Sequence, residues 1–213
     1  PAPMFTAFAV SVIVMNLLAN KSIDLPVSWL ALDCGFIVSW ISFLSMDVIT
    51  KHFGPKAATQ VSVAAVLTNL AVCLLLFASS KIPGVWGESY VAGSESIINA
   101  ALDNTFGGTW YVLLGSTTAF LLSALVNNFL NFAIGRLFRK NPDGFAAYAM
   151  RTYISTAIGQ LTDNLTFAFI VSKVFFGWSL TQCSTCSIVG MLAELLCEVI
   201  FSPVGYSVCR RWK

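Results

Sequence analysis

The chain has 213 residues and a formal net charge of +2, and 57% of its residues are hydrophobic while only 10% are charged. Soluble domains have roughly 45–50% apolar and about 25% charged residues, so this composition excludes an ordinary water-soluble domain and points to a bilayer. The small net charge gives no basic field of the kind that nucleic-acid-binding proteins carry, and we expect no nucleic-acid partner.

Six apolar segments are long enough to cross a bilayer, whose hydrocarbon core about 30 Å thick needs roughly 20 residues per helix. None of them alternates with period two, which disfavours a barrel. The sequence therefore predicts one all-α transmembrane domain over residues 1–213 with six spans. The predicted spans are approximately residues 5–20, 29–50, 58–79, 110–132, 151–178 and 184–209.

The distribution of Lys and Arg orients these spans, because short cytoplasmic loops carry the excess of positive charge. Lys21, Lys81 and Lys173 lie on one side, and the other nine basic residues lie on the opposite side. We therefore expect both termini to be cytoplasmic, the protein to be a multi-pass component of the inner membrane, and residues 81–109 to be extracytoplasmic. Within that outer segment, Ser94 and Glu95 could cap a short surface helix.

The fifth span carries a polar face. At about 100° per residue, Arg151, Ser155 and Asp163 fall on one side of a helix, with Gln160 at the edge of that side. Ionisable side chains at membrane depth are costly and usually mark a substrate or ion path. The alternative is that the hydroxyl groups of this face bind their own backbone or hold helices together.

The second span repeats this pattern at heptad spacing, with Asp33, Trp40 and Asp47 on one face. The Asp47 carboxylate could pair with Arg151 or Lys51. Trp40 could stack on a planar ligand or simply pack within the bundle.

The fourth and sixth spans add two more polar faces. Glu194 and Glu198 lie one turn apart on the sixth, and two ionised carboxylates at that spacing repel each other, which suits a wet cavity or a proton-coupling role. Asparagine side chains combine a donor with an acceptor and suit a ligand with a mixed edge. The fourth span carries a stripe of Ser116, Ser123, Asn127 and Asn131, with Asn128 beside it.

Several chemistries have no support in the sequence. The chain contains no G-x-x-x-x-G-K-[ST] loop for nucleotide hydrolysis. Cys183 and Cys186 form a C-x-x-C pair without the surrounding strands of a thioredoxin, and a zinc site would need two further ligands. Asp47 and Asp163 lack the glycine-flanked setting of an intramembrane aspartic protease. We expect no enzyme, no cofactor and no metal centre.

Two early segments and two late ones carry a family resemblance. Residues 14–21 (VMNLLANK) and 45–57 (SMDVITKHFGPKA) resemble the opening signature of the queuosine precursor transporter family, also called the putative vitamin uptake transporters. Residues 151–164 resemble its fifth-helix motif, and residues 194–206 resemble its sixth. The resemblance covers roughly residues 13–80 and 110–213.

This resemblance implies a six-helix inner-membrane importer of 7-deazaguanines such as preQ0, preQ1 or queuine, which are precursors of a modified nucleoside of transfer RNA. Asp163 or Asp47 could accept the amino and ring N–H groups of such a base, and Gln160 or an asparagine could donate to its carbonyl. Trp40 could cover its flat face. The candidate substrate-binding residues are Asn16, Trp40, Asp47, Asn127, Asn128, Arg151, Ser155, Gln160, Asp163 and Glu194.

Two other functions remain open from the sequence. One is a vitamin-binding membrane component that works with a separate ATP-driven module, and the other is a structural membrane protein without a ligand. Transport itself could be passive or coupled to protons through Glu194, Glu198 or Asp47. A homodimer is compatible with so small a bundle.

Overall fold

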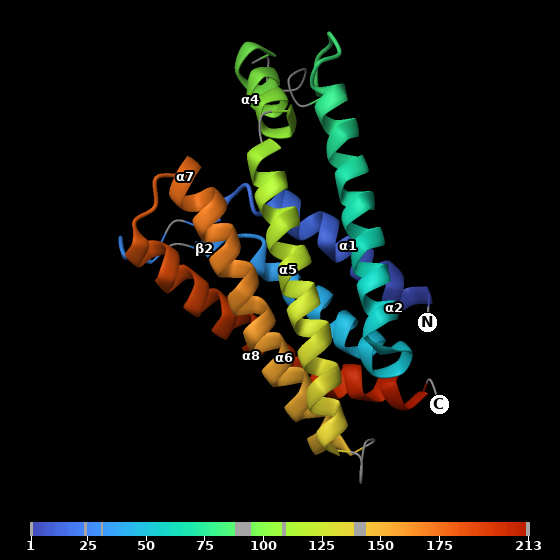
Figure 1. Cartoon of the computed structure of the whole chain (residues 1–213). Coiled ribbons are helices and arrows are strands. Elements are labelled where there is room, and N and C mark those ends of the chain that lie inside the picture. The colour runs from blue at the N-terminus through green and yellow to red at the C-terminus, as the bar shows by residue number, and fades with distance from the viewer. Residues whose placement is uncertain are drawn as a thin grey trace.

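The computed structural model describes residues 2–23, 25–30, 32–87, 95–107, 110–138 and 144–211, and most of them are helical (Figure 1). The fold is therefore helical as expected, apart from a two-stranded hairpin of two residues per strand. The long helices are α1 (Ala2–Leu18), α2 (Phe36–Ser79), α4 (Glu95–Gly107), α5 (Trp110–Gly135), α6 (Phe145–Phe167) and α8 (Leu180–Arg211).

Helix α2 folds back on itself at Gly54, which has φ 82° and ψ 168°. Glycine adopts positive φ without a steric penalty, and Pro55 cannot donate the backbone hydrogen bond that would continue the first arm. The Ser62 hydroxyl lies 3.5 Å from the Met46 sulfur, although a straight helix would separate them by about 24 Å. Helix α2 therefore consists of two opposed arms, residues 36–53 and 55–79, joined at a sharp bend (Figure 1).

The second span was predicted to begin near Trp29, and this is wrong because the helix begins at Phe36. The preceding residues form a short antiparallel hairpin of β1 (Ser22–Ile23) and β2 (Leu32–Asp33). Pro26 has no N–H to donate and disfavours a helix before it. Asp33 accepts the Gly35 N–H at 2.7 Å, the local turn that aspartate commonly forms. Asp33 therefore does not share a helix face with Trp40 and Asp47.

The fifth predicted span, unlike the second, begins earlier than expected, because α6 starts at Phe145 rather than at Arg151. Arg151 therefore lies inside the helix, and its side chain donates to the buried Asn131 within the bundle. Helix α6 continues through a π-helical turn η2 (Ala168–Ser172) into α7 (Lys173–Phe175). The chain then leaves the helix at Gly177, whose φ of 71° ends it in the usual way.

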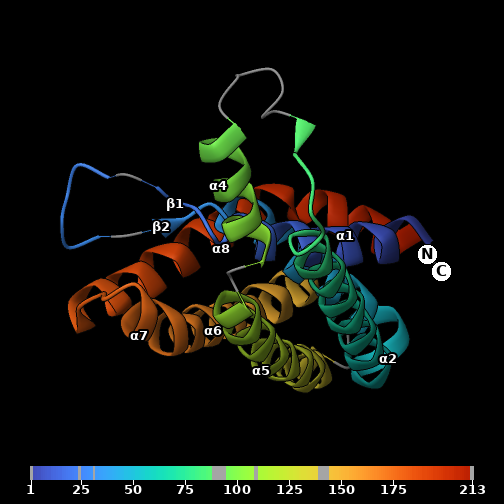
Figure 2. The ribbon, with the colours of Figure 1, turned by 90° about the horizontal axis from the view of Figure 1, so that it is seen from above.

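The helices pack in the pairs α5 with α6, α1 with α2, α2 with α5, and both α6 and α2 with α8 (Figure 2). One apolar cluster joins α1, α2 and α5 through Phe8, Phe43 and Phe120. The outside of the molecule is also apolar: Leu75 and Phe129 are more than two-thirds exposed. Many buried side chains, by contrast, are Ser, Thr, Asn, Asp or Glu. An apolar exterior around polar side chains suits a protein embedded in lipid.

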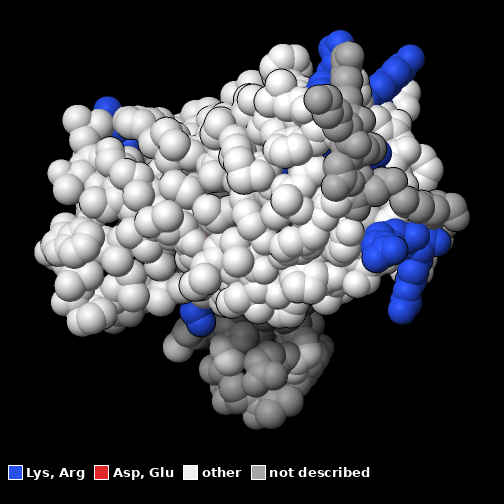
Figure 3. All heavy atoms as spheres, turned by 90° about the horizontal axis from the view of Figure 1, so that it is seen from below, with Lys and Arg blue, Asp and Glu red and all other residues white. Residues whose placement is uncertain are grey.

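Among the described residues, three helical stretches are long and apolar enough to cross a bilayer, namely Phe36–Ser79, Ile97–Phe138 and Leu180–Arg211, and Ala2–Leu18 is a shorter apolar helix. The second of these ends in a 3-10 turn, η1 (Arg136–Phe138). The segment predicted to be extracytoplasmic contains the short helix α4, while Ser94, its suggested cap, lies outside the described residues. Figure 3 shows Lys and Arg gathered mainly toward one end of the lower face, the end where Figure 1 places both termini.

Candidate functional site

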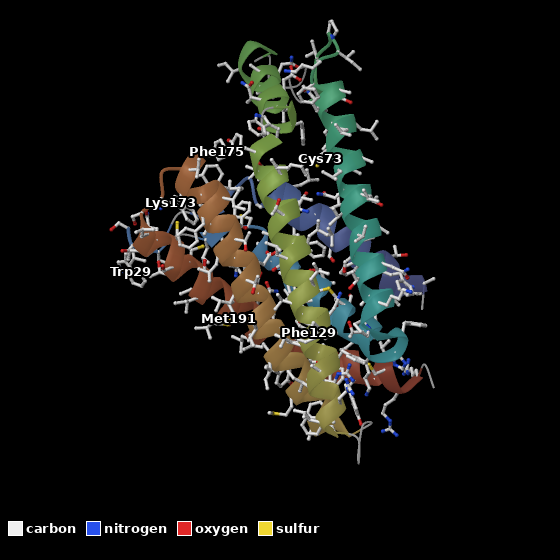
Figure 4. All side chains as sticks on the ribbon, viewed as in Figure 1. Trp29, Cys73, Phe129, Lys173, Phe175 and Met191 are labelled. Atoms are coloured by element: carbon white, nitrogen blue, oxygen red, sulfur yellow. The ribbon has the colours of Figure 1, made fainter. Side chains whose placement is uncertain are left out.

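Three carboxylates from distant parts of the chain line one cavity, which we call the acidic cavity. Asp33 comes from β2, Asp163 from α6 and Glu194 from α8, and Asn16 from α1 faces them. The cavity contains about 510 Å³ of empty space, part of it open to solvent. The loop before α2 is tied to the start of α8, since Thr185 donates to the Trp29 carbonyl at 2.7 Å (Figure 4). The hairpin therefore holds Asp33 against the helices.

Neutral side chains hold the carboxylates of the acidic cavity. The Ser123 hydroxyl donates to Asp163 Oδ1 at 2.9 Å. Glu194 accepts a hydrogen bond from Ser39 and another from Asn164 Nδ2, the latter at 3.4 Å. None of the described residues that line this cavity is Lys, Arg or His. The cavity therefore offers acceptors to a ligand that carries N–H groups or a positive charge.

Asp33 lies in the loop rather than in a spanning helix, and burial raises its pKa to about 6, against the opposing effect of the Gly35 N–H. Ionising Asp33 in the folded protein therefore has a free-energy cost, which appears as pH rises from about 4 to about 6 and persists above it. We predict that Asp33→Asn stabilises the protein at pH 7.5, by up to about 3 kcal/mol, and has little effect at pH 4. Thermal unfolding at both pH values tests this, and an equal shift at each would contradict it.

A second cavity lies between α1, the second arm of α2, α4 and α5, and it contains about 890 Å³ of empty space that is partly open. Its lining is mainly apolar, with Leu74, Phe77 and Phe106, and it includes Cys73, labelled in Figure 4. Asn16 lines both cavities, and its side-chain oxygen accepts a hydrogen bond from Ser116. The pair formed by α1 and α5 therefore lies at the boundary of the two spaces.

A second group of polar residues, which we call the inner polar cluster, surrounds Asp47 on the first arm of α2. Asp47 Oδ1 accepts from Asn127 Nδ2 at 2.8 Å and from the Ser155 hydroxyl at 3.4 Å. Asp47 Oδ2 accepts from the Thr156 hydroxyl at 3.2 Å. Glu198 of α8 lies beside Asp47 and Thr156. All five side chains are buried, so α2, α5, α6 and α8 meet at this cluster.

Gly159 allows the close approach of α6 and α5 that this cluster needs. A Cβ at this position would lie 3.0 Å from both Asn127 Cβ and Phe43 Cε1. Such contacts are tighter than ordinary van der Waals packing. The missing side chain therefore lets the polar face of α6 reach Asn127.

Arg151 supports the same cluster from α6. Its Nε donates to Asn131 Oδ1 at 2.9 Å, and a second guanidinium nitrogen donates to the same oxygen. Asn131 in turn donates to the Ser155 hydroxyl at 3.4 Å. The guanidinium thus acts on Asp47 through its charge, while its hydrogen bonds go to Asn131.

Asn128 braces the two arms of α2. Thr50 donates to its side-chain oxygen at 3.1 Å, and Asn128 Nδ2 donates to Thr59 at 3.2 Å. Thr50 and Thr59 lie on opposite sides of the Gly54 bend, so Asn128 of α5 contacts both arms.

The structure divides the candidate residues between these places. Asn16, Asp163 and Glu194 line the acidic cavity, while Asp47, Asn127, Arg151, Ser155 and Glu198 belong to the inner polar cluster. Trp40 is not among the residues of either group, and its ring stacks on Phe201 with centroids 4.4 Å apart. Gln160 is fully buried, and neither side-chain amide atom has a hydrogen-bond partner among the described residues.

Sequence reasoning did not select Asn164 and Ser39 as site residues, although both hold Glu194. Asn164 directly follows Asp163, so the polar fifth-helix motif contained a signal for it. Ser39 gave no such signal, because a single serine in an apolar run is common and its partner lies 155 residues away.

A helical, lipid-compatible fold with buried carboxylates and a polar cavity defines a membrane protein of the transporter class. The chain belongs to the putative vitamin uptake transporter family, whose model matches residues 33–208. The match includes both arms of α2, all of α5 and α6, and α8 except for its last three residues. No curated protein and no solved structure matches the chain.

Proposed function

We propose that this transporter imports 7-deazaguanine precursors of queuosine across the inner membrane and binds them in the acidic cavity. The observation that carries the proposal is the convergence of Asp33, Asp163 and Glu194 with Asn16 and Asn164 on one space. Membership of a vitamin uptake family supports the transport of a small molecule. The motifs at residues 14–21, 45–57 and 151–164 support the queuosine precursors as its substrates.

The proposed topology has six crossings, with each arm of α2 crossing separately and both termini in the cytoplasm. The bend at Gly54, the neighbouring termini and the basic residues gathered near them support this arrangement (Figures 1 and 3). The acidic cavity then lies in the outer half of the bundle, since it includes the loop before α2. The inner polar cluster lies deeper, toward the basic side.

The chemistry of the cavity suits one edge of a deazaguanine. The base presents an amino group and a ring N–H side by side, and the carboxylates of Asp163 and Glu194 can accept both. The carbonyl of the base needs a donor, and the amide groups of Asn16 and Asn164 can supply one. Gln160 and Trp40, proposed for these roles from the sequence, are not among the lining residues, so we assign the contacts to the asparagines instead.

The test is the thermal stability of purified protein with cyano-deazaguanine, aminomethyl-deazaguanine, queuine, guanine or riboflavin. A ligand that binds only the folded state at 100 times its Kd stabilises it by about 2.7 kcal/mol. We expect a deazaguanine to raise the melting temperature and guanine or riboflavin to raise it less. Folded protein that responds to no deazaguanine would refute the proposed substrate.

The family description names vitamin uptake, so the other candidate substrate is a vitamin. The other candidate function is a vitamin-binding component that depends on a separate ATP-driven module. Stabilisation by riboflavin alone would support it. Uptake of a deazaguanine by proteoliposomes that contain this chain alone, without ATP, would exclude that dependence. A structural protein without a ligand would show no stabilisation by any compound in the panel.

A further inference from the structure

Unpaired polar atoms gather around the inner polar cluster. Asn127 Oδ1 and both atoms of the Gln160 amide have no hydrogen-bond partner among the described residues. Thr152 Oγ1 and the two oxygens of Glu198 make no hydrogen bond of normal geometry there, although Thr152 lies against Tyr148 and Glu198 lies against Thr156 and Asp47. Each of these side chains is at most 1% exposed. Buried polar groups are nearly always paired, and an exception indicates a bound ion or water. Asn127, Thr152, Gln160 and Glu198 lie on α5, α6 and α8, in contact with Asp47 or within one helical turn of residues that contact it, while other such atoms, those of Asn69, Thr117 and Ser172 among them, lie elsewhere.

The atoms in question are mostly oxygens of three kinds: carboxylate, amide carbonyl and hydroxyl. Hard cations prefer such ligands, whereas zinc, copper and iron prefer Cys or His. Within the described part of the chain, no three His, Cys, Asp or Glu side chains are placed so that they alone could hold a metal ion. The donor set therefore suits a cation that coordinates neutral oxygens together with one or two carboxylates.

The charges of the cluster favour a monovalent cation. Glu198 lies against Asp47, and the Arg151 guanidinium acts on Asp47 through one positive charge. A cation that holds both carboxyl groups in their ionised form faces two negative charges against that single positive charge. One further positive charge neutralises the set, while a divalent ion would leave an excess. Because Arg151 directs its hydrogen bonds to Asn131, it does not occupy the Asp47 oxygens.

The site is also compact. Asn127 and Thr156 already contact Asp47 at 2.8 and 3.2 Å, so the candidate ligands from α2, α5 and α6 lie within hydrogen-bond distance of one carboxyl group. Carbonyl and carboxylate oxygens at membrane depth are the ligands with which transporters hold sodium.

We infer that the inner polar cluster binds a sodium ion through Asp47, Asn127 and Glu198, with Thr152 or Gln160 completing the shell. The sequence indicated no metal centre, and the inference goes beyond the proposed function. Glu198 lies one turn of α8 from Glu194, and Gln160 lies one turn of α6 from Asp163. The ion therefore sits one helical turn from the acidic cavity, where it links the ion gradient to the substrate.

The competing occupant is a proton shared by Asp47 and Glu198. The titratable and charged groups around them are Arg151 and Tyr148 of α6, Glu194 and Cys209 of α8, and Lys51 of α2, whose Nζ lies 5.6 Å from the centre of the Tyr148 ring. A sodium ion and a shared proton differ in one respect that can be measured, the response to sodium at constant pH.

The experiment measures thermal unfolding at pH 7.5 without any deazaguanine, as NaCl replaces choline chloride or KCl at constant ionic strength. We expect the melting temperature to rise with sodium and not with potassium. Glu198→Gln and Asp47→Asn should lower the apparent sodium affinity at least about 10-fold. Asp163→Asn, a matched change in the acidic cavity, should retain the response.

An equal response of the natural protein to all three salts would overturn the inference. A sodium-independent protein whose pH dependence is removed by Glu198→Gln would assign the cluster to the proton instead. Should Asp47→Asn not fold, Thr156→Val and Glu198→Gln still test the site from two other helices. The salt experiment contains no deazaguanine, so a negative result does not bear on the proposed substrate. A negative result with the deazaguanine panel likewise does not bear on the sodium site.

Discussion

Replacing Arg151 with methionine should destabilise the protein by about 3–5 kcal/mol, because removal of one partner from a buried charged group leaves the others uncompensated. Methionine retains much of the apolar volume of the arginine stem, so the loss reflects charge and hydrogen bonding rather than a cavity. Asp47 and Glu198 would remain buried side by side, and Asn131 would lose the donor of two hydrogen bonds. Chemical or thermal unfolding in detergent measures the change.

Two further variants separate this explanation from general damage to α6. Arg151→Met combined with Glu198→Gln should recover part of the lost stability, since one of the two carboxylates is neutralised. Arg136→Met, a matched change at an exposed position, should alter stability by less than about 0.5 kcal/mol. If the double variant is as unstable as the single one, Arg151 does not stabilise the protein by balancing the charges of Asp47 and Glu198.

Helical periodicity identified the polar interior of this protein because ionisable groups in a membrane must face inward. Arg151, Ser155 and Asp163 recur on one side of α6, and that side faces α2, α5 and α8. The same reasoning found Asp47, Asn127 and Glu194. One-dimensional periodicity is sufficient for this step, since it requires only the direction in which each side chain leaves its own helix.

The division of these residues into two sites could not be obtained in this way. Glu194 and Glu198 lie on one face of α8, yet Glu194 lines the acidic cavity and Glu198 lies beside Asp47. Which helix each glutamate meets depends on crossing angles and relative heights of the helices, and neither quantity is encoded in the spacing of a single segment. Likewise, the heptad spacing of Asp33, Trp40 and Asp47 suggested one helix face. Pro26 and the turn at Asp33 instead place Asp33 in a hairpin.

Trp40 shows a different limit of sequence reasoning. A tryptophan one heptad from a carboxylate fits both ligand stacking and bundle packing, and its ring in fact lies parallel to Phe201 of α8. Aromatic pairs of this kind contribute about 0.5–1.5 kcal/mol beyond area burial. The partner lies 161 positions along the chain, so the choice between the two roles required the tertiary structure.

Replacing Asp163 with asparagine should reduce deazaguanine binding and uptake about 10- to 100-fold, the range expected from the loss of a hydrogen bond to a charged acceptor. In the proposed contact, the base donates to the Asp163 oxygen that does not accept from Ser123. In the Asp163→Asn variant, an NH₂ group can take the place of this oxygen, and a donor would then face the donor edge of the base. The change preserves the size and shape of the side chain, so the fold should remain intact. Uptake into proteoliposomes and ligand-induced thermal stabilisation both measure the effect.

Ser123→Ala is the matched control for this prediction, because it removes the 2.9 Å hydrogen bond to Asp163 Oδ1 and leaves the carboxylate in place. We expect it to weaken binding by less than Asp163→Asn, because the acceptor for the base remains. If Asp163 only holds α5 to α6, both variants should instead lower the melting temperature and leave ligand affinity unchanged. That result would assign Asp163 and Ser123 to helix packing, and Glu194 or Asp33 would then be the candidate contacts for the substrate.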